Sequence, residues 1–229
     1  RKGKGQHGAS RKAAAGVRRN LYCMQADVRK FYPSINHDIL MGTVERKIKD
    51  PHVLWLLEDI IYSIPGGKNV PIGNYTSQWL GNLYLNELDM YVKHELKVKD
   101  YIRYNDDFVI FGNDKRELHE HRRKIQEFLA KRLDLTMSKD KVFPVSQGLD
   151  FVGYRHFPDK ILLRRSTSKR VKKKLRGLMR EVRAGLLPPE SARAVIASTE
   201  GWLQWANTHN FSISLQLEKL KGEIHELCA

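Results

Sequence analysis

Three aspartates are the residues of this sequence best suited to chemistry. Asp106 and Asp107 are adjacent in the segment YNDDFVIFG, between the apolar runs YIRY and FVIF. Neighbouring carboxylates disfavour each other's ionised form, whereas a divalent cation would make the pair favourable. Asp27, which ends the apolar segment LYCMQADV, is the third. If these segments form neighbouring strands, the three carboxylates meet at one end of a sheet and can hold two Mg²⁺ ions about 4 Å apart.

Two such ions suit the transfer of a nucleotide to a growing chain. One ion activates a 3′ hydroxyl, and the other holds the triphosphate and stabilises the leaving pyrophosphate. Magnesium is satisfied by one or two carboxylates together with phosphate oxygens and water, and Mn²⁺ is a possible substitute. Solvation at a turn would explain a lone aspartate, but the adjacent pair together with Asp27 favours a metal site.

The composition points to a polyanionic partner. The 229 residues carry 41 basic and 26 acidic side chains, a formal charge of +15, which favours nucleic acid over a membrane surface. No run of about 18 apolar residues and no secretory leader occurs, so we expect a cytoplasmic protein without a membrane span. The histidines and the two cysteines lack zinc-ligand spacing. The opening RKGKGQHGAS, without methionine, is typical of a fragment.

Strand and helix patterns indicate which elements position the aspartates. Residues 21–28 predict a strand that ends at Asp27, and residues 101–112 predict a hairpin with Asn105–Asp107 at its turn. Helices are predicted at 7–19, from the capping residue Asn36 to about Lys49, at 51–64 after the capping residue Asp50, from Ser77 onward, and at 114–133. Ser77 either caps its helix or contacts the template, and short strands follow around LTMS and LDFVGYRHF.

A change of composition after Leu163 predicts a domain boundary. Residues 164–229 read as a helical module, and the apolar residues of its first helix, Val171, Leu175, Leu178 and Val182, line one face. The same helix is rich in cations that would follow a phosphate backbone without reading sequence. These are Arg164, Arg165, Lys169, Arg170, Lys172, Lys173 and Lys174. A solvated helix face is the alternative interpretation.

Five motifs in chain order resemble those of reverse transcriptases. YNDD is similar to their Y-x-D-D box, and Asp27 followed by FYPSIN to their first carboxylate motif. PIGNYTSQWLGNLYLNELD, SKDKVFPVSQ and FVGY resemble three further motifs, so the resemblance covers about residues 1–185. It implies an α+β right-hand polymerase fold with a fingers remnant and an antiparallel-sheet palm in residues 1–163, and a helical thumb in 164–229. The implied activity is RNA-directed DNA synthesis from dNTPs, with an RNA template and a DNA or RNA primer.

One branch of this family, the reverse transcriptases of bacterial and phage diversity-generating retroelements, is more similar still. RKGKGQHGA, IKDPHVLWLLEDII and IGNYTSQ carry that resemblance. Ordinary members have Q-G-x-x-x-S-P where this chain has Ile72 for the glutamine and Gln78 for the proline. Ile72 cannot hydrogen-bond the incoming nucleotide, so low fidelity is expected. The resemblance further implies misincorporation opposite template adenine and a small basic accessory protein.

The resemblance also implies roles around the nucleotide. Tyr32 is either the aromatic gate that excludes a 2′ hydroxyl or a core aromatic, and Val28 offers a metal its backbone carbonyl. Gly73 and Gln78 are expected at the nucleotide. Lys141 either protonates the leaving pyrophosphate or is a surface lysine. One of the basic residues near the start, among them Arg1 and Arg11, is expected to hold the triphosphate.

At the primer end, the resemblance makes FVGY the primer grip, with Phe151, Gly153 and Tyr154 as its residues; palm core is the alternative for its apolar members. Two other functions stay open. The chain could belong to a group II intron or antiphage defence reverse transcriptase, although IGNYTSQ argues against the intron type. It could also be a catalytically silent RNA-binding scaffold, although such scaffolds typically lose the carboxylates that Asp27, Asp106 and Asp107 retain.

Overall fold

The computed structural model of the chain describes residues 5–71 and 73–228, with side chains up to residue 226. The chain divides into two compact units. We call Arg19–Val145 the central unit, and the described residues up to Arg18 together with those from Ser146 onward the terminal unit. Each unit has its own sheet.

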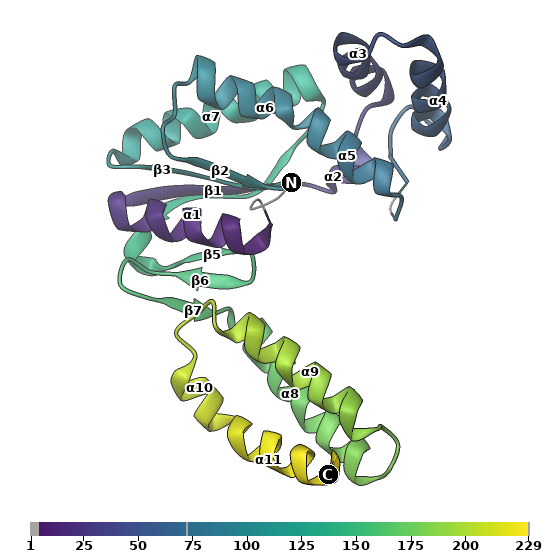
Figure 1. Cartoon of the computed structure of the whole chain (residues 1–229). Coiled ribbons are helices and arrows are strands. Elements are labelled where there is room, and N and C mark those ends of the chain that lie inside the picture. Colours follow the sequence, from purple (N-terminus) through teal and green to yellow (C-terminus); the bar gives the residue numbers. More distant parts are fainter. Residues whose placement is uncertain (1–4, 72, 229) are drawn as a thin grey trace. The chain divides into compact units, whose positions relative to one another are not determined.

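The central unit is built on a four-stranded antiparallel sheet with the order β2-β3-β1-β4 (Figure 1). The strands are β1 Tyr22–Val28, β2 Tyr101–Tyr104, β3 Asp107–Gly112 and β4 Met137–Pro144. The helices α6 (Asn86–Met90) and α7 (Lys115–Leu133) lie across one face, over alternate strand residues such as Met24, Ala26 and Ile110. The predicted pairing of residues 21–28 with the 101–112 hairpin is confirmed.

Short helices complete the central unit beyond one end of this sheet (Figure 1). They are α2 Phe31–Ser34, α3 His37–Lys47, α4 Pro51–Tyr62 and α5 Tyr75–Tyr84. A π-helical turn, η1 at Tyr91–Glu95, instead continues α6, and its Tyr91 ring stacks on Phe128 of α7. The two predicted caps are confirmed, because the Asn36 and Asp50 side chains each accept two backbone N–H groups of the first turn. The start predicted at Ser77 is wrong, since Asn74 is the N-cap of α5 and Ser77 lies buried inside the helix.

The terminal unit joins the start of the chain to its last third. Helix α1 (Gln6–Arg19) packs on the antiparallel sheet of β5 Leu149–Phe151, β6 Tyr154–His156 and β7 Ile161–Leu163. Two polar contacts fix it there: the Gln6 amide donates to the Val152 carbonyl (2.7 Å), and the Ser10 hydroxyl contacts the ring of the buried His156 (2.9 Å).

Four helices follow this small sheet, α8 Arg165–Arg183, α9 Pro189–Leu203, α10 His209–Ser214 and α11 Leu217–Cys228. The predicted apolar face of α8 is confirmed, because Leu175, Leu178 and Val182 are buried in one cluster with residues of α9 and α11, and Val171 packs against it. The boundary between the compact units lies at Val145, before the small sheet rather than after it. The assignment of residues 1–163 to fingers and palm is a functional division and stays a prediction. No helix among the described residues has the length and apolar character to span a bilayer.

Candidate active site

The three aspartates gather at one end of the central sheet. Asp27, in β1, lies directly opposite Asp107, in β3, and residues directly opposite in an antiparallel pair present their side chains to the same face. Asp106 precedes Asp107 in the two-residue turn between β2 and β3, and its carboxyl contacts that of Asp27. Asn105, the first residue of this turn, has a φ of 55°, a conformation that asparagine tolerates better than most residues.

Crowding of the carboxylates alters their protonation. Burial raises the pKa of the Asp106 carboxyl above its ordinary value, and the charge of Asp27 and its hydrogen bond to Asp106 add to this increase. A hydrogen bond from the Asp106 backbone and the charge of Lys139 act in the opposite direction. Together these contributions leave the Asp106 pKa raised, so ionising both Asp27 and Asp106 is unfavourable. Binding of a proton or of a cation to the pair is therefore favoured.

This donor set fits a hard divalent cation that arrives with a nucleotide. Within the described ranges, no group of three or more His, Cys, Asp or Glu side chains converges closely enough to hold a metal ion alone. The Asp27 and Asp106 carboxyls are in contact, however, and Mg²⁺ needs only one or two carboxylates when phosphate oxygens and water complete its shell. Val28, the last residue of β1, follows Asp27 directly, so its backbone lies beside the same site.

Lys139, two residues before the predicted Lys141, forms an ion pair with this site. The Lys139 ammonium lies 3.5 Å from an Asp27 carboxylate oxygen. Lys141 pairs with Gln25 in the register between β1 and β4, and a bulge between Gln25 and Asp27 then shifts this register. The bulge coincides with a positive φ of 52° at Lys139. SKDK offers two lysines at i and i+2, and the sequence alone cannot select between them.

The raised pKa of Asp106 predicts a gain of stability when its charge is removed. The pKa of the Asp106 carboxyl is higher in the folded protein than in the unfolded chain. Such a group lowers the free energy of unfolding at pH values above its unfolded-state pKa, and this loss of stability disappears as the pH falls below the unfolded-state pKa. Asp106→Asn should therefore raise the melting temperature of the metal-free protein at pH 7, and by less near pH 4. Thermal denaturation in a chelator, followed by circular dichroism, measures this. A lower melting temperature at pH 7 would contradict it.

The Tyr32 phenol lies close enough to the Asp106 carboxylate for the charge of Asp106 to affect the Tyr32 pKa. Its ring packs against Phe31 (5.2 Å between centroids) and against Gly81 of α5, where an added Cβ would come within 3.2 Å of it. Burial raises the pKa of the Tyr32 phenol, and the negative charge of Asp106 adds to this. Tyr32 therefore combines a packed ring with a position beside the carboxylates, and both of its predicted roles remain compatible with this placement.

Two further residues predicted to contact the nucleotide lie around the start of α5. Gly73 has a φ of 109° in the turn just before the N-cap, a conformation that favours glycine. Gln78 has an exposed side chain in the first half of the helix. Ile72 and Arg1 lie outside the described residues. Arg11 belongs to the terminal unit, where its guanidinium lies over the Trp205 ring (5.4 Å to the centroid).

FVGY forms a tight turn with buried flanks. Phe151 and Tyr154 are fully buried, so their side chains do not reach a primer, whereas Val152 and Gly153 between them are partly exposed. Val152 and Gly153 between them both have positive φ, of 44° and 87°. The turn is held by the Gln6 amide on the Val152 carbonyl and by the Arg164 backbone N–H on the Gly153 carbonyl (3.2 Å). The Tyr154 hydroxyl anchors it further by donating to the Trp202 carbonyl (3.2 Å).

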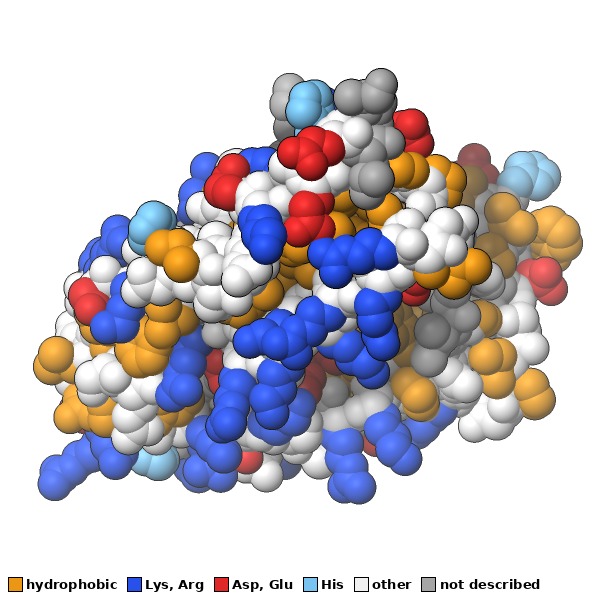
Figure 2. All heavy atoms as spheres, turned by 90° about the horizontal axis from the view of Figure 1, so that it is seen from below, with side chains coloured by type: hydrophobic (Ala, Val, Ile, Leu, Met, Phe, Trp, Pro, Cys, Tyr) orange, Lys and Arg blue, Asp and Glu red, His pale blue; other side chains and the backbone are white. Residues whose placement is uncertain are grey.

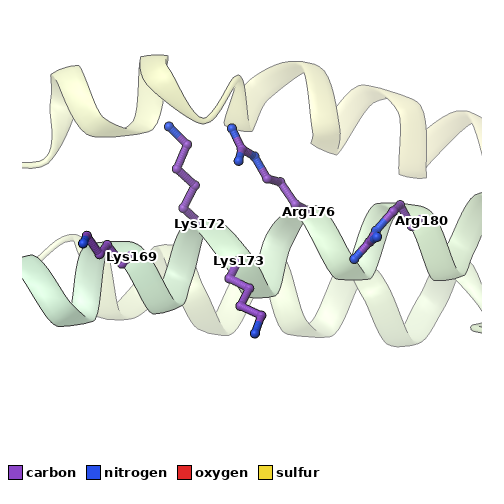
Figure 3. A pocket seen from close by; sticks show the side chains of 5 residues that line it. All are labelled: Lys169, Lys172, Lys173, Arg176 and Arg180. Atoms are coloured by element: carbon purple, nitrogen blue, oxygen red, sulfur yellow. The ribbon is translucent and has the colours of Figure 1, made fainter.

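The predicted cations of α8 form an exposed basic face. Lys169, Lys172 and Lys173 line a depression of about 660 Å³ together with Arg176 and Arg180, which the sequence analysis did not single out (Figure 3). Lys172 and Arg176 point to one side of the helix, whereas Lys173 points to the other (Figure 3). Lys and Arg side chains also gather on the face of the molecule drawn in Figure 2. Such a surface suits the phosphate backbone of a nucleic acid. Arg165, Arg170 and Lys174 are also exposed on α8, whereas Arg164, at its N-cap, is half-buried and its guanidinium lies 3.9 Å from the Asp150 carboxylate.

A family model, one curated protein and a solved structure are similar to this chain. The profile described as "Reverse transcriptase (RNA-dependent DNA polymerase)" matches residues 1–156, a region that contains all three aspartates. Protein YkfC of Escherichia coli (strain K12) is 27% identical over 183 residues, which cover 61% of this chain and 48% of YkfC. Among solved structures, the telomerase of Candida albicans in complex with a fragment of telomeric RNA is similar, with a TM-score of 0.52 and 13% identity.

That structural likeness covers 74% of this chain and 37% of the telomerase chain. At such a low identity it concerns the fold alone. The chain thus spans about half the length of YkfC and just over a third of the telomerase chain.

Proposed function

Because this chain belongs to the reverse transcriptase (RNA-dependent DNA polymerase) family, we propose that it extends a primer along an RNA template by two-metal nucleotidyl transfer. Its fold is the mixed helix-and-sheet fold of right-hand polymerases. The observation that carries the proposal is the placement of Asp27 opposite Asp107 in the sheet, with the Asp106 carboxyl in contact with Asp27.

In the proposed mechanism, the 3′ hydroxyl of the primer gives its proton to solvent water and its oxygen forms a bond to the α-phosphorus of a dNTP, while the bond from that phosphorus to the leaving pyrophosphate breaks. Asp27 and Asp106, with the Val28 carbonyl and Asp107 beside them, would hold Mg²⁺, which supplies charge stabilisation at the entering and leaving oxygens. A lysine of the SKDK segment balances charge on the pyrophosphate and returns a proton to it. Lys141 is our predicted donor, and Lys139 is paired with Asp27.

The remaining predicted residues divide between nucleotide and primer. Tyr32 excludes the 2′ hydroxyl, and Gly73, Gln78 and the undescribed Ile72 shape the nucleotide pocket. Arg1 or Arg11 holds the triphosphate. The turn of FVGY supports the primer end through its backbone, and the basic face of α8 follows the duplex. The functional division into fingers and palm (1–163) and thumb (164–229) belongs to the same proposal.

We further propose that the enzyme is of the error-prone type found in diversity-generating retroelements. Support comes from IGNYTSQ, in which an apolar residue stands where a hydrogen-bonding glutamine is usual. Contact alone discriminates between bases much less than hydrogen bonding does. In this proposal the enzyme works in the cytoplasm, copies a template repeat RNA and misincorporates opposite adenine, and a small basic protein assists it.

Single-nucleotide primer extension on an RNA template with Mg²⁺ tests both levels of the proposal. Each dNTP is offered separately opposite template A and opposite template C. Wrong nucleotides are expected to be accepted about tenfold or more often opposite A than opposite C, a difference of about 1.4 kcal/mol, because the branch that this chain resembles misincorporates opposite adenine. Equal accuracy at both positions would leave a reverse transcriptase and contradict the retroelement type. RNA binding without extension or metal-dependent dNTP binding would favour the scaffold.

A further inference from the structure

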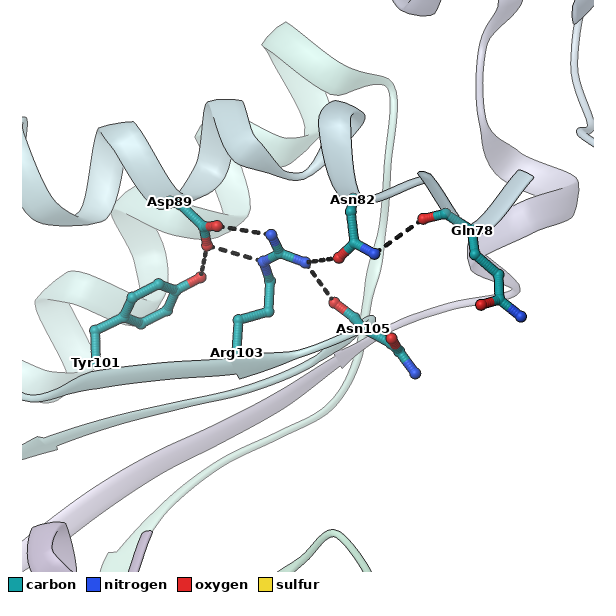
Figure 4. A network of polar contacts seen from close by, with 6 residues as sticks. All are labelled: Gln78, Asn82, Asp89, Tyr101, Arg103 and Asn105. Carbon is teal, nitrogen blue, oxygen red and sulfur yellow. Dashed lines mark hydrogen bonds and ion pairs between the residues drawn. The ribbon is translucent and has the colours of Figure 1, made fainter. Parts of the chain in front are cut away.

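Arg103, three residues before Asp106, has a guanidinium that makes four hydrogen bonds to three groups. Its Nε donates to Asp89 Oδ1 (2.8 Å), and its second terminal nitrogen donates to Asp89 Oδ2 (2.6 Å). Its first terminal nitrogen donates to the Asn82 side-chain oxygen (3.1 Å) and to the Asn105 backbone carbonyl (2.9 Å). Figure 4 shows the fork in the middle of this network, between the strand and the helices.

The environment of this fork favours a fixed geometry. The Arg103 side chain is only 10% exposed and that of Asp89 22% exposed, so the bidentate pair is largely desolvated. Asp89 Oδ1 also accepts the Tyr101 hydroxyl (2.7 Å). Burial acts to lower the pKa of Arg103, but its hydrogen bonds with Asp89 and the charge of Asp89 outweigh burial and raise this pKa. Arg103 therefore stays charged at every pH of interest.

The four bonds connect three elements that act on the same reaction. Asp89 belongs to α6, and Asn82 belongs to α5, the helix that carries Gln78. The Asn82 amide in turn donates to the Gln78 backbone carbonyl (2.9 Å). Asn105 is the turn residue with positive φ that immediately precedes Asp106. One side chain thus ties the carboxylate turn to the helix beside the nucleotide.

Charge neutralisation alone does not account for this arrangement. The bidentate bond to Asp89 already neutralises the guanidinium, and an ammonium at this position would do the same. The two remaining bonds go to exposed residues, Asn82 and Asn105, whose polar atoms water could satisfy. What these bonds add is a fixed orientation of the turn, which only the planar fork of arginine can give while it holds Asp89.

We propose that Arg103 is a positioning residue for nucleotide addition, which sets the orientation of the Asp106 turn relative to α5. The inference rests on the proposed function, because it concerns the same carboxylates. The main variant is Arg103→Lys, which keeps the charge beside Asp89 but cannot also reach Asn105 and Asn82. Asn82→Ala, at an exposed helical position, removes the bond from Arg103 to α5 together with the Asn82–Gln78 bond within that helix, and it does not endanger the fold.

Arg19→Lys is the matched control. Arg19 also pairs with an aspartate, Asp100, at 2.7 Å. Arg19 precedes β1 and Asp100 precedes β2. Tyr22, at the start of β1, pairs with Gly112 at the end of β3, so the Arg19–Asp100 pair lies at the end of the sheet opposite to Asp27 and Asp107. The variant makes the same chemical change in the same unit, far along the strands from the carboxylates.

Single-turnover primer extension over a range of dNTP concentrations gives the test, with amide hydrogen exchange of the 101–112 segment as a second readout. For Arg103→Lys we expect the rate constant at saturating dNTP to fall about tenfold or more, the usual loss for a supporting residue around a metal site. The half-saturating dNTP concentration should change by less than about twofold, and exchange in the turn should accelerate. Asn82→Ala should lower the rate about twofold to fivefold and accelerate exchange in the turn.

A saturating rate for Arg103→Lys equal to that of Arg19→Lys would overturn the inference, and so would unchanged exchange in the turn. If Arg103→Lys fails to fold, a normal rate and normal turn exchange for Asn82→Ala would overturn it. Wild-type protein that does not extend a primer at all would instead refute the proposed function and, with it, the role of Arg103. Primer extension by the wild-type protein therefore distinguishes failure of the proposed function from failure of the inference about Arg103.

Discussion

Asp106→Asn is expected to lower the rate of nucleotide addition by about a thousandfold or more, equivalent to about 4 kcal/mol of lost transition-state stabilisation. The amide keeps the shape of the side chain but loses the negative charge that would bind a cation, and it is this cation that would neutralise the phosphate oxygens. Single-turnover primer extension with Mg²⁺ measures the loss. The same substitution should stabilise the metal-free protein, because burial and Asp27 raise the pKa of this carboxyl. A substitution that lowers activity but raises stability is typical of a residue that is retained for function rather than for folding.

A matched substitution separates this effect from a general change of charge. Asp59→Asn removes an equal charge from an exposed position of α4, in the same unit. It should leave the rate within about twofold of wild type, as surface substitutions usually do. A comparable loss in both variants would mean that net charge, and not the carboxylate site, governs extension. Full activity of Asp106→Asn would remove the basis of the two-metal proposal.

Tyr32→Ala should increase the use of ribonucleotides about tenfold to a hundredfold relative to deoxyribonucleotides. Steric exclusion by contact is worth roughly 1–3 kcal/mol, and alanine removes the whole ring from the position between Phe31, Gly81 and Asp106. The ratio of kcat/KM for a rNTP and the matching dNTP on one template measures the change. We expect an increase in ribonucleotide use because a gate that excludes the 2′ hydroxyl by steric contact is lost when the ring is removed.

Tyr32→Phe is the control, because it keeps the ring and loses only the hydroxyl. It should discriminate against ribonucleotides almost as well as wild type. If both variants discriminate normally, Tyr32 is a core aromatic that packs on α5, which was the alternative interpretation of its position. If phenylalanine alone already relaxes the discrimination, the hydroxyl rather than the ring makes the decisive contact.

Local patterns were sufficient to predict the carboxylates and the sheet that presents them. Asp27 ends an apolar strand and Asp106 occupies a hairpin turn, so pairing of the two strands was enough to bring them together. The prominence of Lys139 was not predictable, because it depends on a bulge between β1 and β4, strands more than 100 residues apart in the chain. Bulges are set by the pairing of whole strands and leave little trace in a short segment.

Residues that act through long-range contacts could not be predicted from local sequence patterns for a related reason. Arg103 reads as a polar residue in a strand, and its partners Asp89 and Asn82 lie 14 and 21 residues away in two helices. The start of α5 was misplaced because Ser77 is a good capping residue by type, while Asn74 occupies the cap position. Propensity identifies the candidates, and tertiary packing selects among them.

The division of the chain into two units has a consequence for synthesis on the ribosome. The central unit is one continuous segment, whereas the terminal unit joins α1 to partners such as β5, which begins about 130 residues after α1 ends. At typical elongation rates α1 emerges on the order of 10 s before any strand on which it can pack. Its apolar side, including Ala13 and Val17, must meanwhile stay exposed or be shielded by a chaperone. The carboxylate sheet of the central unit is therefore synthesised in full before α1 can pack on the small sheet of the terminal unit.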